Sequence, residues 1–318
     1  MARVAMLGAG AFGTAVGAVL ARAGHDVVML CRTAEQDAAI RATGQNARYF
    51  PGVHLPDGMS TTTHFAAVAD ADALFLAYPA RLMDDFAAQI AAHARADATI
   101  VNLVKGLHPA HFTFAALFRH VAPQRRYVAL KGPTFARPLF LGEWSGLTCG
   151  SDDADAVDAT IALFDRAPIV FDRATSADAV DVASALKNVY AIALGLVGST
   201  GPSENTVYMA ATLVVRELRT ILCALGYGEG VVTSFAGIGD TLLTGLCDTS
   251  RNRTLGLMIG KGIPLDTGRS DFLAEGVRAV AAIEAHLSGI HTPLLHTVAD
   301  VLAGRVPPTA IFDTFGLR

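Results

Sequence analysis

Residues 3–15 read RVAMLGAGAFGTA. Arg3–Leu7 is a short apolar run typical of a strand, and a helical pattern extends from Phe12 to Ala23. Between them, Gly8-Ala9-Gly10-Ala11-Phe12-Gly13 has the GxGxxG spacing, in which the first glycine permits a tight turn, the second lets the backbone approach a pyrophosphate, and the third allows close helix packing. The context predicts a Rossmann phosphate loop that holds a dinucleotide at a helix N-terminus, and a purely structural turn is the alternative.

The first half of the chain alternates apolar segments with helical or turn-like stretches. Such alternation is typical of an open, mostly parallel sheet covered on both faces. Residues 151–160, rich in Asp and Ala, resemble a solvated loop that leads into a helix. The apolar segments are 3–7, 26–30, 73–78, 99–103, 127–130 and 145–149.

From about Ala177 onward the pattern changes to apolar stretches of helical length, such as Ala179–Leu196 and Thr206–Leu225. A chain of 318 residues also exceeds the usual size of one hydrophobic core. We therefore predict an α/β Rossmann-type dinucleotide-binding domain at residues 1–175, followed by an all-α substrate-binding domain at residues 176–318.

Composition limits the class of protein. The chain is 52% apolar and 17% charged, has no uninterrupted apolar run of eighteen residues, and shows no apolar signal segment after Met1, which favours a cytoplasmic protein without membrane insertion. A net charge of -4 without charged runs argues against nucleic acid and favours a small-molecule partner. The apolar helical half suggests a homodimer. The cysteines lack metal-ligand or disulfide spacing, so we expect no metal site and reduced thiols: Cys31, Cys149, Cys223 and Cys247.

The second predicted strand, His25–Leu30, is followed by Cys31-Arg32-Thr33. An NAD site usually places Asp or Glu here to bind the ribose hydroxyls, whereas an arginine suits the 2′-phosphate of NADP. Arg32 therefore favours NADP over NAD, and the alternative is a solvated arginine at a strand end.

Lys187 lies in the stretch AVDVASALKNVYAIALGL at 179–196, where it is the only charge after Asp181. A buried ammonium there must pair with a carboxylate, lower its pKa, or face a polar cleft, and each of these conditions suits a general acid or base. Lys187 is the first catalytic candidate, and the alternative is a lysine that extends past its neighbours to water.

Two arginines occupy the first turn of the helix predicted after Ser250, in DTSRNRTLGL at 248–257. Cations are unfavourable at a helix N-terminus unless an anion also binds there, so Arg251 and Asn252 predict a phosphorylated substrate. Solvent-screened or interface arginines are the alternative. Upstream, Asp240 is a single carboxylate in a glycine-rich apolar stretch and could simply cap the next helix.

With these motifs in order, the chain resembles the bacterial NAD(P)-dependent glycerol-3-phosphate dehydrogenases from residue 3 to about residue 280. The matching segments are GAGAFGTA at 8–15, NARYFPGVHLP at 46–56, VKGL at 104–107, GPTFA at 132–136, LKNVYAIALG at 186–195, GIGD at 237–240, SRNR at 250–253, GKG at 260–262 and EGV at 275–277.

The resemblance implies a substrate pair of dihydroxyacetone phosphate and sn-glycerol 3-phosphate, with hydride passing to or from the nicotinamide. Lys187 falls on the family's catalytic lysine and Lys105 on its second lysine, near both substrate and nicotinamide. Asp240 would orient or charge-balance Lys187. Arg251 and Asn252, with Ser250 beside them, fall on positions that hold the substrate phosphate.

Further positions match cofactor contacts of the family. Besides the glycine loop, Arg32, Lys105 and Arg251, they are Gly132, Thr134, Ala136 and Glu275. The chain departs from the family pattern at Tyr78, Lys131, Arg137 and residues 198–204, so the shape of the cleft can differ. One alternative is a paralogue that reduces a different phosphorylated ketone or aldehyde, and another is a non-catalytic nucleotide-responsive binding protein.

Overall fold

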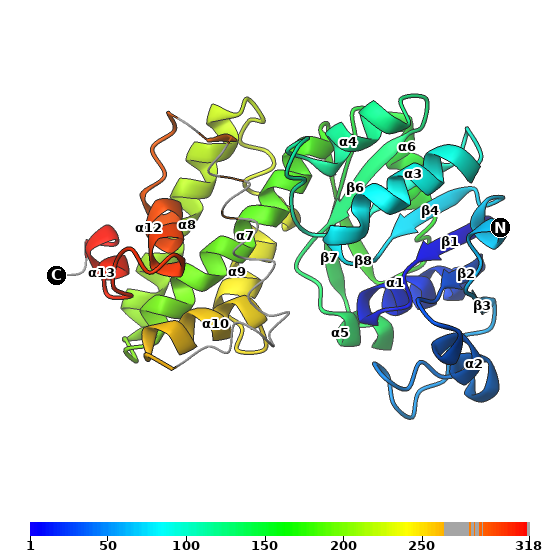
Figure 1. The fold of residues 1–318 in the computed structure, drawn as a ribbon, viewed down its shortest axis with the longest axis horizontal. Coiled ribbons are helices and arrows are strands. Elements are labelled where there is room, and N and C mark those ends of the chain that lie inside the picture. Colours follow the sequence, from blue (N-terminus) through cyan, green and yellow to red (C-terminus); the bar gives the residue numbers. More distant parts are fainter. Residues whose placement is uncertain (264–279, 281–282, 284–285, 288, 317–318) are drawn as a thin grey trace. The chain divides into compact units, whose positions relative to one another are not determined.

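The computed structural model describes residues 1–263, 280, 283, 286–287 and 289–316, and its contacts form two compact units (Figure 1). Unit 1 comprises residues 1–105 and 113–178, and unit 2 comprises residues 106–112 together with the described part of 179–318. The short segment 106–112 therefore leaves unit 1 and returns to it, which the sequence pattern did not predict.

Unit 1 is built on one eight-stranded sheet with the order β3-β2-β1-β4-β5-β6-β7-β8. All neighbouring strands are parallel except β6 and β7. The predicted mostly parallel sheet is confirmed. The strands are β1 Arg3–Leu7, β2 Asp26–Leu30, β3 Met59–Thr62, β4 Ala73–Leu76, β5 Thr99–Asn102, β6 Tyr127–Lys131, β7 Ser145–Gly150 and β8 Ile169–Ala174.

Two of these strands were not predicted from the sequence. β3, with the sequence MSTT, is too short and polar to give an apolar run, and β8 lies at an edge with partly exposed side chains. The central strands are buried on both faces, as their continuous apolar runs predict. In β1, Val4 and Met6 join α1 in one core cluster, whereas the equally buried Ala5 and Leu7 alternate to the other face.

The helices of unit 1 connect and cover these strands. α1 packs against α5, and α3 packs against α4 (Figure 1). The Asp/Ala-rich stretch leads into α6, and Asp153 caps this helix by accepting from the N–H groups of Asp155 and Ala156. The helices are α1 Ala11–Arg22, α2 Ala34–Thr43, α3 Met83–His93, α4 Phe114–Val121, α5 Ala136–Leu141 and α6 Ala154–Ala162.

The regular secondary structure in the described residues of unit 2 is helical, apart from one isolated bridge between His108 and Phe112. The predicted all-α second half is confirmed for these residues. A one-turn π-helix, Phe235–Gly239, runs directly into α9. The helices are α7 Ala177–Gly198, whose first two residues belong to unit 1, α8 Glu204–Ala224, α9 Asp240–Leu246, α10 Arg251–Gly260, α12 Pro293–Leu302 and α13 Ala310–Thr314.

α7 is the central helix of unit 2, and every residue from Ala179 to Val197 is buried. A helix that is apolar on all faces is stable only when other elements surround it. Among the described residues, α7 is the helix whose length and composition would allow it to cross a membrane, and its apolar window lies entirely inside the fold, as in a core helix. Lys187 therefore sits in the core of unit 2.

Candidate functional site

The glycine loop of unit 1 lies between β1 and α1, where the strand order changes direction. Gly8 has a φ of +127°, and a Cβ atom there would meet the carbonyl oxygen of Ala77 at 2.4 Å. A Cβ atom at Gly13 would meet the carbonyl oxygen of Gly8 at 2.2 Å, whereas at Gly10 nothing lies within 4 Å. The fold itself requires glycine at 8 and 13. Gly10 instead leaves open space beside the backbone, which fits a bound pyrophosphate.

The first turn of α1 offers backbone donors to an anion. Gly10 is its N-cap residue and has no side chain to cap the helix. Thr14 is the first residue whose N–H bonds back to the helix start, donating to the Gly10 carbonyl at 2.9 Å. The N–H groups of Ala11, Phe12 and Gly13 precede this bond, and such groups bind phosphate at helix N-termini. The loop thus fits the predicted dinucleotide.

Asn46 braces the loop, although the local sequence gave no reason to select it. Its Nδ2 donates to the Ala9 carbonyl at 3.0 Å and to Thr14 Oγ1 at 2.8 Å, and Gln36 Nε2 donates to the same Ala9 carbonyl at 2.8 Å. Asn46 is buried and belongs to the segment 46–56 that carried the family resemblance. That resemblance was the only signal that could have found it.

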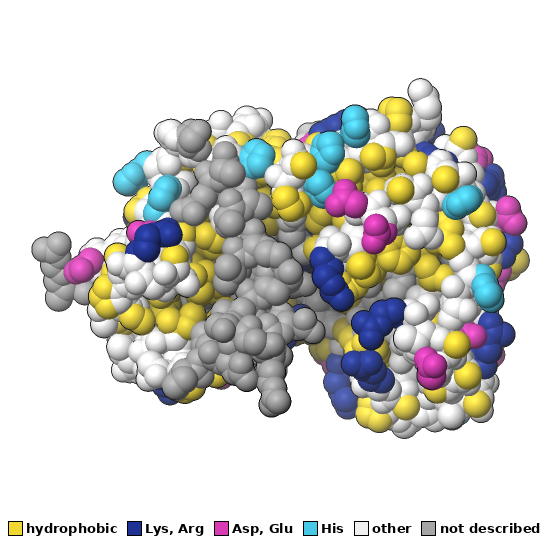
Figure 2. All heavy atoms as spheres, viewed as in Figure 1, with side chains coloured by type: hydrophobic (Ala, Val, Ile, Leu, Met, Phe, Trp, Pro, Cys, Tyr) yellow, Lys and Arg dark blue, Asp and Glu magenta, His cyan; other side chains and the backbone are white. Residues whose placement is uncertain are grey.

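Arg32 lies two residues beyond the end of β2 and is exposed. Because β2 runs parallel to β1, Arg32 and the glycine loop share the carboxyl edge of the sheet, at the point where doubly wound sheets bind ligands. Figure 2 shows Lys and Arg side chains gathered on this face of unit 1 in the region of α1 and α5. A cationic surface attracts phosphate groups. That Arg32 gives the protein a preference for NADP over NAD stays a prediction.

Four further candidates follow β5 and β6 at the same edge. Lys105 Nζ donates to the Gly132 carbonyl at 3.4 Å, and the Thr134 N–H donates to that carbonyl at 2.9 Å. Thr134 Oγ1 also donates to the Gly146 carbonyl at 3.2 Å, and Ala136 begins α5 two residues later. The structure therefore brings Lys105, Gly132 and Thr134 together, while their contact with a cofactor stays a prediction.

The departures from the family pattern in unit 1 differ in environment. The Tyr78 hydroxyl donates to Met83 Sδ at 3.2 Å, and its ring stacks on Phe86 with centroids 4.0 Å apart. Burial raises the pKa of Tyr78 well above its usual range, so this phenol stays neutral. Lys131 is also buried and contacts backbone carbonyls of the segment after β5, whereas Arg137 is exposed in α5. Tyr78 and Lys131 therefore pack into unit 1 itself.

In unit 2, Lys187 pairs with Asp240. Lys187 Nζ donates to Asp240 Oδ1 at 2.6 Å and to Thr244 Oγ1 at 3.0 Å, and Thr244 Oγ1 lies 3.3 Å from the same carboxylate oxygen. The side chains of Lys187 and Asp240 are 7% and 1% exposed, which excludes a lysine that extends to water. Of the three predicted environments, pairing with a carboxylate is the one found. Thr244 was missed, although its position four residues after Asp240 places both on one helix face.

Asn188 and Asn252 connect this pair to the predicted phosphate site. Asn252 Nδ2 donates to Asn188 Oδ1 at 2.8 Å, and Asn188 directly follows Lys187 and is buried. The contact is possible because α7 and α10 cross closely. A Cβ atom at Gly195 would meet Gly256 Cα at 2.9 Å, and a Cβ atom at Gly256 would meet Gly195 Cα at 2.9 Å. Asn188 escaped sequence reasoning because nothing marks an asparagine within an apolar helix as a contact.

The two arginines at the start of α10 have different surroundings. Arg253 Nη1 donates to the Gly245 carbonyl at 3.1 Å, and its Nε lies 3.3 Å from Asp248 Oδ1, so it joins α10 to the end of α9. Arg251 is exposed at the first helical position. Ser250 Oγ accepts from the Arg253 N–H and thereby caps the helix. Arg251 and Asn252 thus remain the residues predicted to bind a phosphate, and Ser250 supports their helix.

The departures at residues 198–204 form the connection between α7 and α8. Gly198 ends α7, and Glu204 begins α8. Gly198 lies eleven positions after Lys187, which corresponds to about 16 Å along the helix axis. Gly198 thus lies about three turns away from Lys187 along α7.

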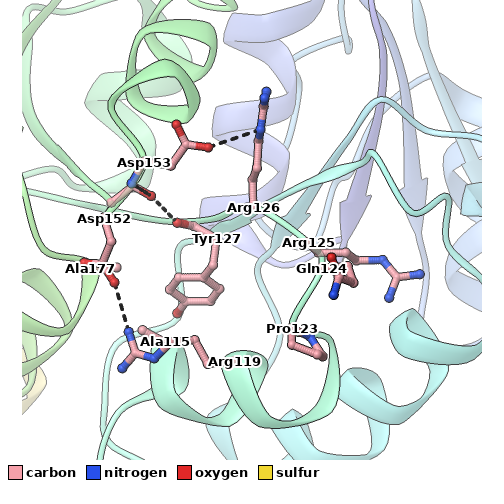
Figure 3. A pocket seen from close by; sticks show the side chains of 11 residues that line it. Ala115, Arg119, Pro123, Gln124, Arg125, Arg126, Tyr127, Asp152, Asp153 and Ala177 are labelled. Atoms are coloured by element: carbon pink, nitrogen blue, oxygen red, sulfur yellow. Dashed lines mark hydrogen bonds and ion pairs between the residues drawn. The ribbon is translucent and has the colours of Figure 1, made fainter.

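A pocket of about 400 Å³ lies at the opposite, amino edge of the sheet in unit 1 (Figure 3). Four of its charged groups pair with one another: Arg126 Nε lies 3.2 Å from Asp153, and Arg119 lies 3.1 Å from Asp152. Arg125 donates to backbone carbonyls instead. None of the predicted site residues lines it. The lining residues are Ala115, Arg119, Pro123, Gln124, Arg125, Arg126, Tyr127, Ser151, Asp152, Asp153 and Ala177.

Two further expectations concern metals and thiols. Within the described residues, no group of three or more His, Cys, Asp or Glu side chains is placed to hold a metal ion. All four cysteines are free thiols, and burial raises the pKa of Cys31 to about 11 and that of Cys149 to about 12, which makes both poor nucleophiles. Glu275, predicted to contact the cofactor, lies outside the described residues.

Comparison with known proteins covers nearly the whole chain. The family model for the N-terminus of NAD-dependent glycerol-3-phosphate dehydrogenase matches residues 3–157, and the model for its C-terminus matches residues 177–313. A relative in Methanothermobacter thermautotrophicus, named an NAD(P)+ glycerol-3-phosphate dehydrogenase, is 34% identical over 94% of this chain and 92% of its own. A relative of the same name in a Bradyrhizobium species is 31% identical over 99% of this chain and 96% of its own.

The fold agrees with a solved structure. The crystal structure of a glycerol-3-phosphate dehydrogenase from Coxiella burnetii superimposes with a TM-score of 0.90, covering 100% of this chain and 99% of the other. At 22% identity this likeness concerns the fold alone.

Proposed function

The chain belongs to the NAD-dependent glycerol-3-phosphate dehydrogenase family, and we propose that it interconverts dihydroxyacetone phosphate and sn-glycerol 3-phosphate with NAD(P). The observation that carries this proposal is the buried ion pair between Lys187 and Asp240, which lies one residue along α7 from the contact between Asn188 and Asn252. A proton donor and a polar group at the predicted phosphate site are thereby connected through adjacent residues of α7.

The proposed chemistry divides among the chain's own groups. Bound NAD(P) would supply or accept the hydride. Lys187 donates a proton to the ketone oxygen during reduction, and Lys105 polarises the same oxygen. Asp240 and Thr244 fix the direction of the Lys187 ammonium, because each lies within hydrogen-bond distance of Nζ.

Substrate binding is assigned to the start of α10. Arg251 supplies a positive charge, Asn252 supplies an amide, and the first turn supplies N–H groups for the substrate phosphate. Held at that end, the carbonyl carbon would meet the nicotinamide in one orientation. Ser250 has a supporting part, since its hydroxyl caps the helix.

The cofactor is assigned to the carboxyl edge of the sheet in unit 1. The contacts proposed there are Gly8, Gly10, Ala11, Phe12, Gly13, Arg32, Lys105, Gly132, Thr134 and Ala136. NADP is slightly favoured because Arg32 is exposed and cationic beside the end of β2. Comparing the KM values for NADPH and NADH in the wild type and in Arg32→Ala tests this preference. A large preference for NADH in the wild type would remove Arg32 from this role.

We further propose that residues 1–175 bind the dinucleotide and residues 176–318 bind the substrate. The protein would act in the cytoplasm as a homodimer, without nucleic acid and without membrane insertion. Exposed Tyr208 and Met209 on α8 support a second copy as partner, since large apolar side chains on a surface favour association. Sedimentation equilibrium that finds only monomer would reject the dimer.

The decisive experiment follows oxidation of NADPH and NADH in the presence of dihydroxyacetone phosphate. We expect turnover with both cofactors, and the reverse reaction with sn-glycerol 3-phosphate. If neither cofactor is oxidised, the proposed activity is wrong. A panel of other phosphorylated ketones and aldehydes then tests whether the chain is a paralogue with a different substrate.

A further inference from the structure

Lysine is rare in this chain. Of its 25 lysines and arginines only four are lysines, at positions 105, 131, 187 and 261. Lys261 is exposed, whereas Lys105 and Lys187 are the two lysines of the proposed reaction. An ammonium is a compact point charge with three donors, whereas a guanidinium is a wide planar fork, so a buried lysine suits a narrow site. The fourth such position, Lys131, has no part in the function proposed above.

Lys131 ends β6 and is 1% exposed. Its Nζ donates to the carbonyl oxygen of Asn102 at 2.8 Å and to that of Val104 at 2.7 Å. An ammonium is costly to bury unless its hydrogen-bonding capacity is used. The two carbonyls lie on either side of Leu103. A single side chain therefore binds the backbone of residues 102–104, where β5 ends.

The N–H groups of the same segment have partners of their own. The Leu103 N–H donates to the Leu76 carbonyl at 3.0 Å, and the Val104 N–H donates to Asn102 Oδ1 at 2.8 Å. The amides of this segment therefore depend on β4 and on a neighbouring side chain, while two of its carbonyls share the Lys131 ammonium. Removing that ammonium takes away a cross-link at two points at once.

Lys105 comes directly after this gripped segment. Its Nζ reaches back to the Gly132 carbonyl, and Gly132 is the residue next to Lys131. The ends of β5 and β6 are thus joined by two side chains: Lys131 of β6 bonds to residues 102 and 104, and Lys105 bonds back to Gly132. Displacing the segment 102–104 would displace Lys105 with it.

We propose that Lys131 is a positioning residue for Lys105: its buried ammonium holds the carbonyls of residues 102 and 104 and so fixes where Lys105 is presented at the carboxyl edge of the sheet. The assignment of a reaction to Lys105 rests on the proposed function. The cross-link itself does not, and it can be measured without turnover.

The test uses Lys131→Met, which keeps most of the length of the side chain and removes the donors, with Lys261→Met as the exposed control. Hydrogen–deuterium exchange is followed in a peptide spanning residues 99–107. We expect faster exchange of this peptide in Lys131→Met than in the wild type, with little change elsewhere in unit 1 and none in the control. Unchanged exchange in residues 99–107, or faster exchange throughout unit 1, overturns the proposal.

Kinetics supply the second readout. Because misplacement of a reacting group by about 1 Å can cost up to ~100-fold in rate, we expect kcat to fall about 10- to 100-fold in Lys131→Met. The KM for NADPH should rise by a smaller factor than kcat falls, since Lys105 is only one of the proposed cofactor contacts and the glycine loop is untouched. Faster local exchange with an unchanged kcat overturns the proposal.

If Lys131→Met does not fold, Lys131→Gln replaces it, because the glutamine amide keeps a donor for one of the carbonyls. We expect this variant to change exchange and kcat in the same direction, but less. Failure of both variants to fold means that the sheet itself needs Lys131 and overturns the specific role. If the wild type does not reduce dihydroxyacetone phosphate, the proposed function fails, but the exchange experiment still decides whether Lys131 fixes the segment before Lys105.

Discussion

Units 1 and 2 each bury a lysine, and they satisfy it in different ways. In unit 1, Lys131 donates to two backbone carbonyls that the sheet presents whatever the neighbouring side chains are. In unit 2, Lys187 depends on the side chains of Asp240 and Thr244. Two partners of Lys131 are therefore neutral backbone dipoles, whereas Lys187 bonds to a carboxylate of opposite charge and to a hydroxyl.

The same difference extends to other buried polar groups of unit 2. Asn188 is bonded by Asn252, and Glu217 accepts from the Tyr190 hydroxyl and from backbone N–H groups at the start of α12. Helices keep their backbone bonds to themselves, so a polar group buried between helices needs a side chain or a helix end as partner. Single substitutions should therefore have larger effects in unit 2 than in the sheet of unit 1.

The largest effect is expected at Lys187. Lys187→Met removes the proposed proton donor, and we expect kcat to fall about 100- to 10,000-fold. Binding of NADPH, measured by fluorescence titration, should persist because the glycine loop belongs to unit 1. Lys261→Met is the matched control and should keep full activity. Full activity in Lys187→Met would exclude the proposed mechanism.

Asp240→Asn should have the next largest effect, on stability. It leaves the Lys187 ammonium buried without its carboxylate, which is expected to cost about 3–5 kcal/mol. Urea unfolding followed by circular dichroism measures the free energy of unfolding. The double variant Lys187→Met/Asp240→Asn removes both charges and should recover most of the loss. Equal destabilisation in the single and double variants would mean that the pair contributes little.

Glu217 gives a pH-dependent test of the same contrast. Burial raises the pKa of Glu217 above 4.5, although N–H donors from Leu294 and Leu295 oppose the shift. A carboxyl whose pKa is raised by folding stabilises the protein below its unfolded pKa, and this contribution is lost as the pH rises through its folded pKa. The wild type should therefore lose stability relative to Glu217→Gln as the pH rises from about 4.5.

At low pH, Glu217→Gln should be less stable than the wild type by about 1–3 kcal/mol, because an amide group then faces a backbone donor at the start of α12. Urea unfolding of both proteins between pH 4 and pH 8 gives the difference. A gap that widens with rising pH would contradict the direction of the Glu217 shift.

The smallest effect separates binding from folding in unit 1. Gly10→Ala places a methyl group where nothing lies within 4 Å and where φ is −80°, so we expect the Tm to stay the same or rise slightly. The Kd for NADPH should rise about tenfold or more, because the methyl group occupies the space left for the pyrophosphate. Gly8→Ala is the contrasting variant and should unfold the loop. Unchanged affinity in Gly10→Ala would place the pyrophosphate elsewhere.

Some features of the fold and of the candidate site could be predicted from the sequence, and others could not. The glycine loop, the parallel strands and the buried helix around Lys187 carry periodic or short-range signals, and the structure has all three. β3 and β8 were missed because a short polar strand and an edge strand need no apolar run. Asn46, Asn188 and Thr244 were missed because their partners lie on other elements or on another turn.

By itself, the sequence determined the fold class and the chemistry available: a strand–glycine–helix unit, one lysine in an apolar helix, and arginines at a helix start. These follow from local geometry, in which spacing and side-chain type act within a few residues. Only the tertiary structure decided the partners, because a hydrogen bond between distant residues depends on where the helices and strands cross. It gave Lys187 a carboxylate and Lys131 two carbonyls, which no local pattern around either lysine predicts.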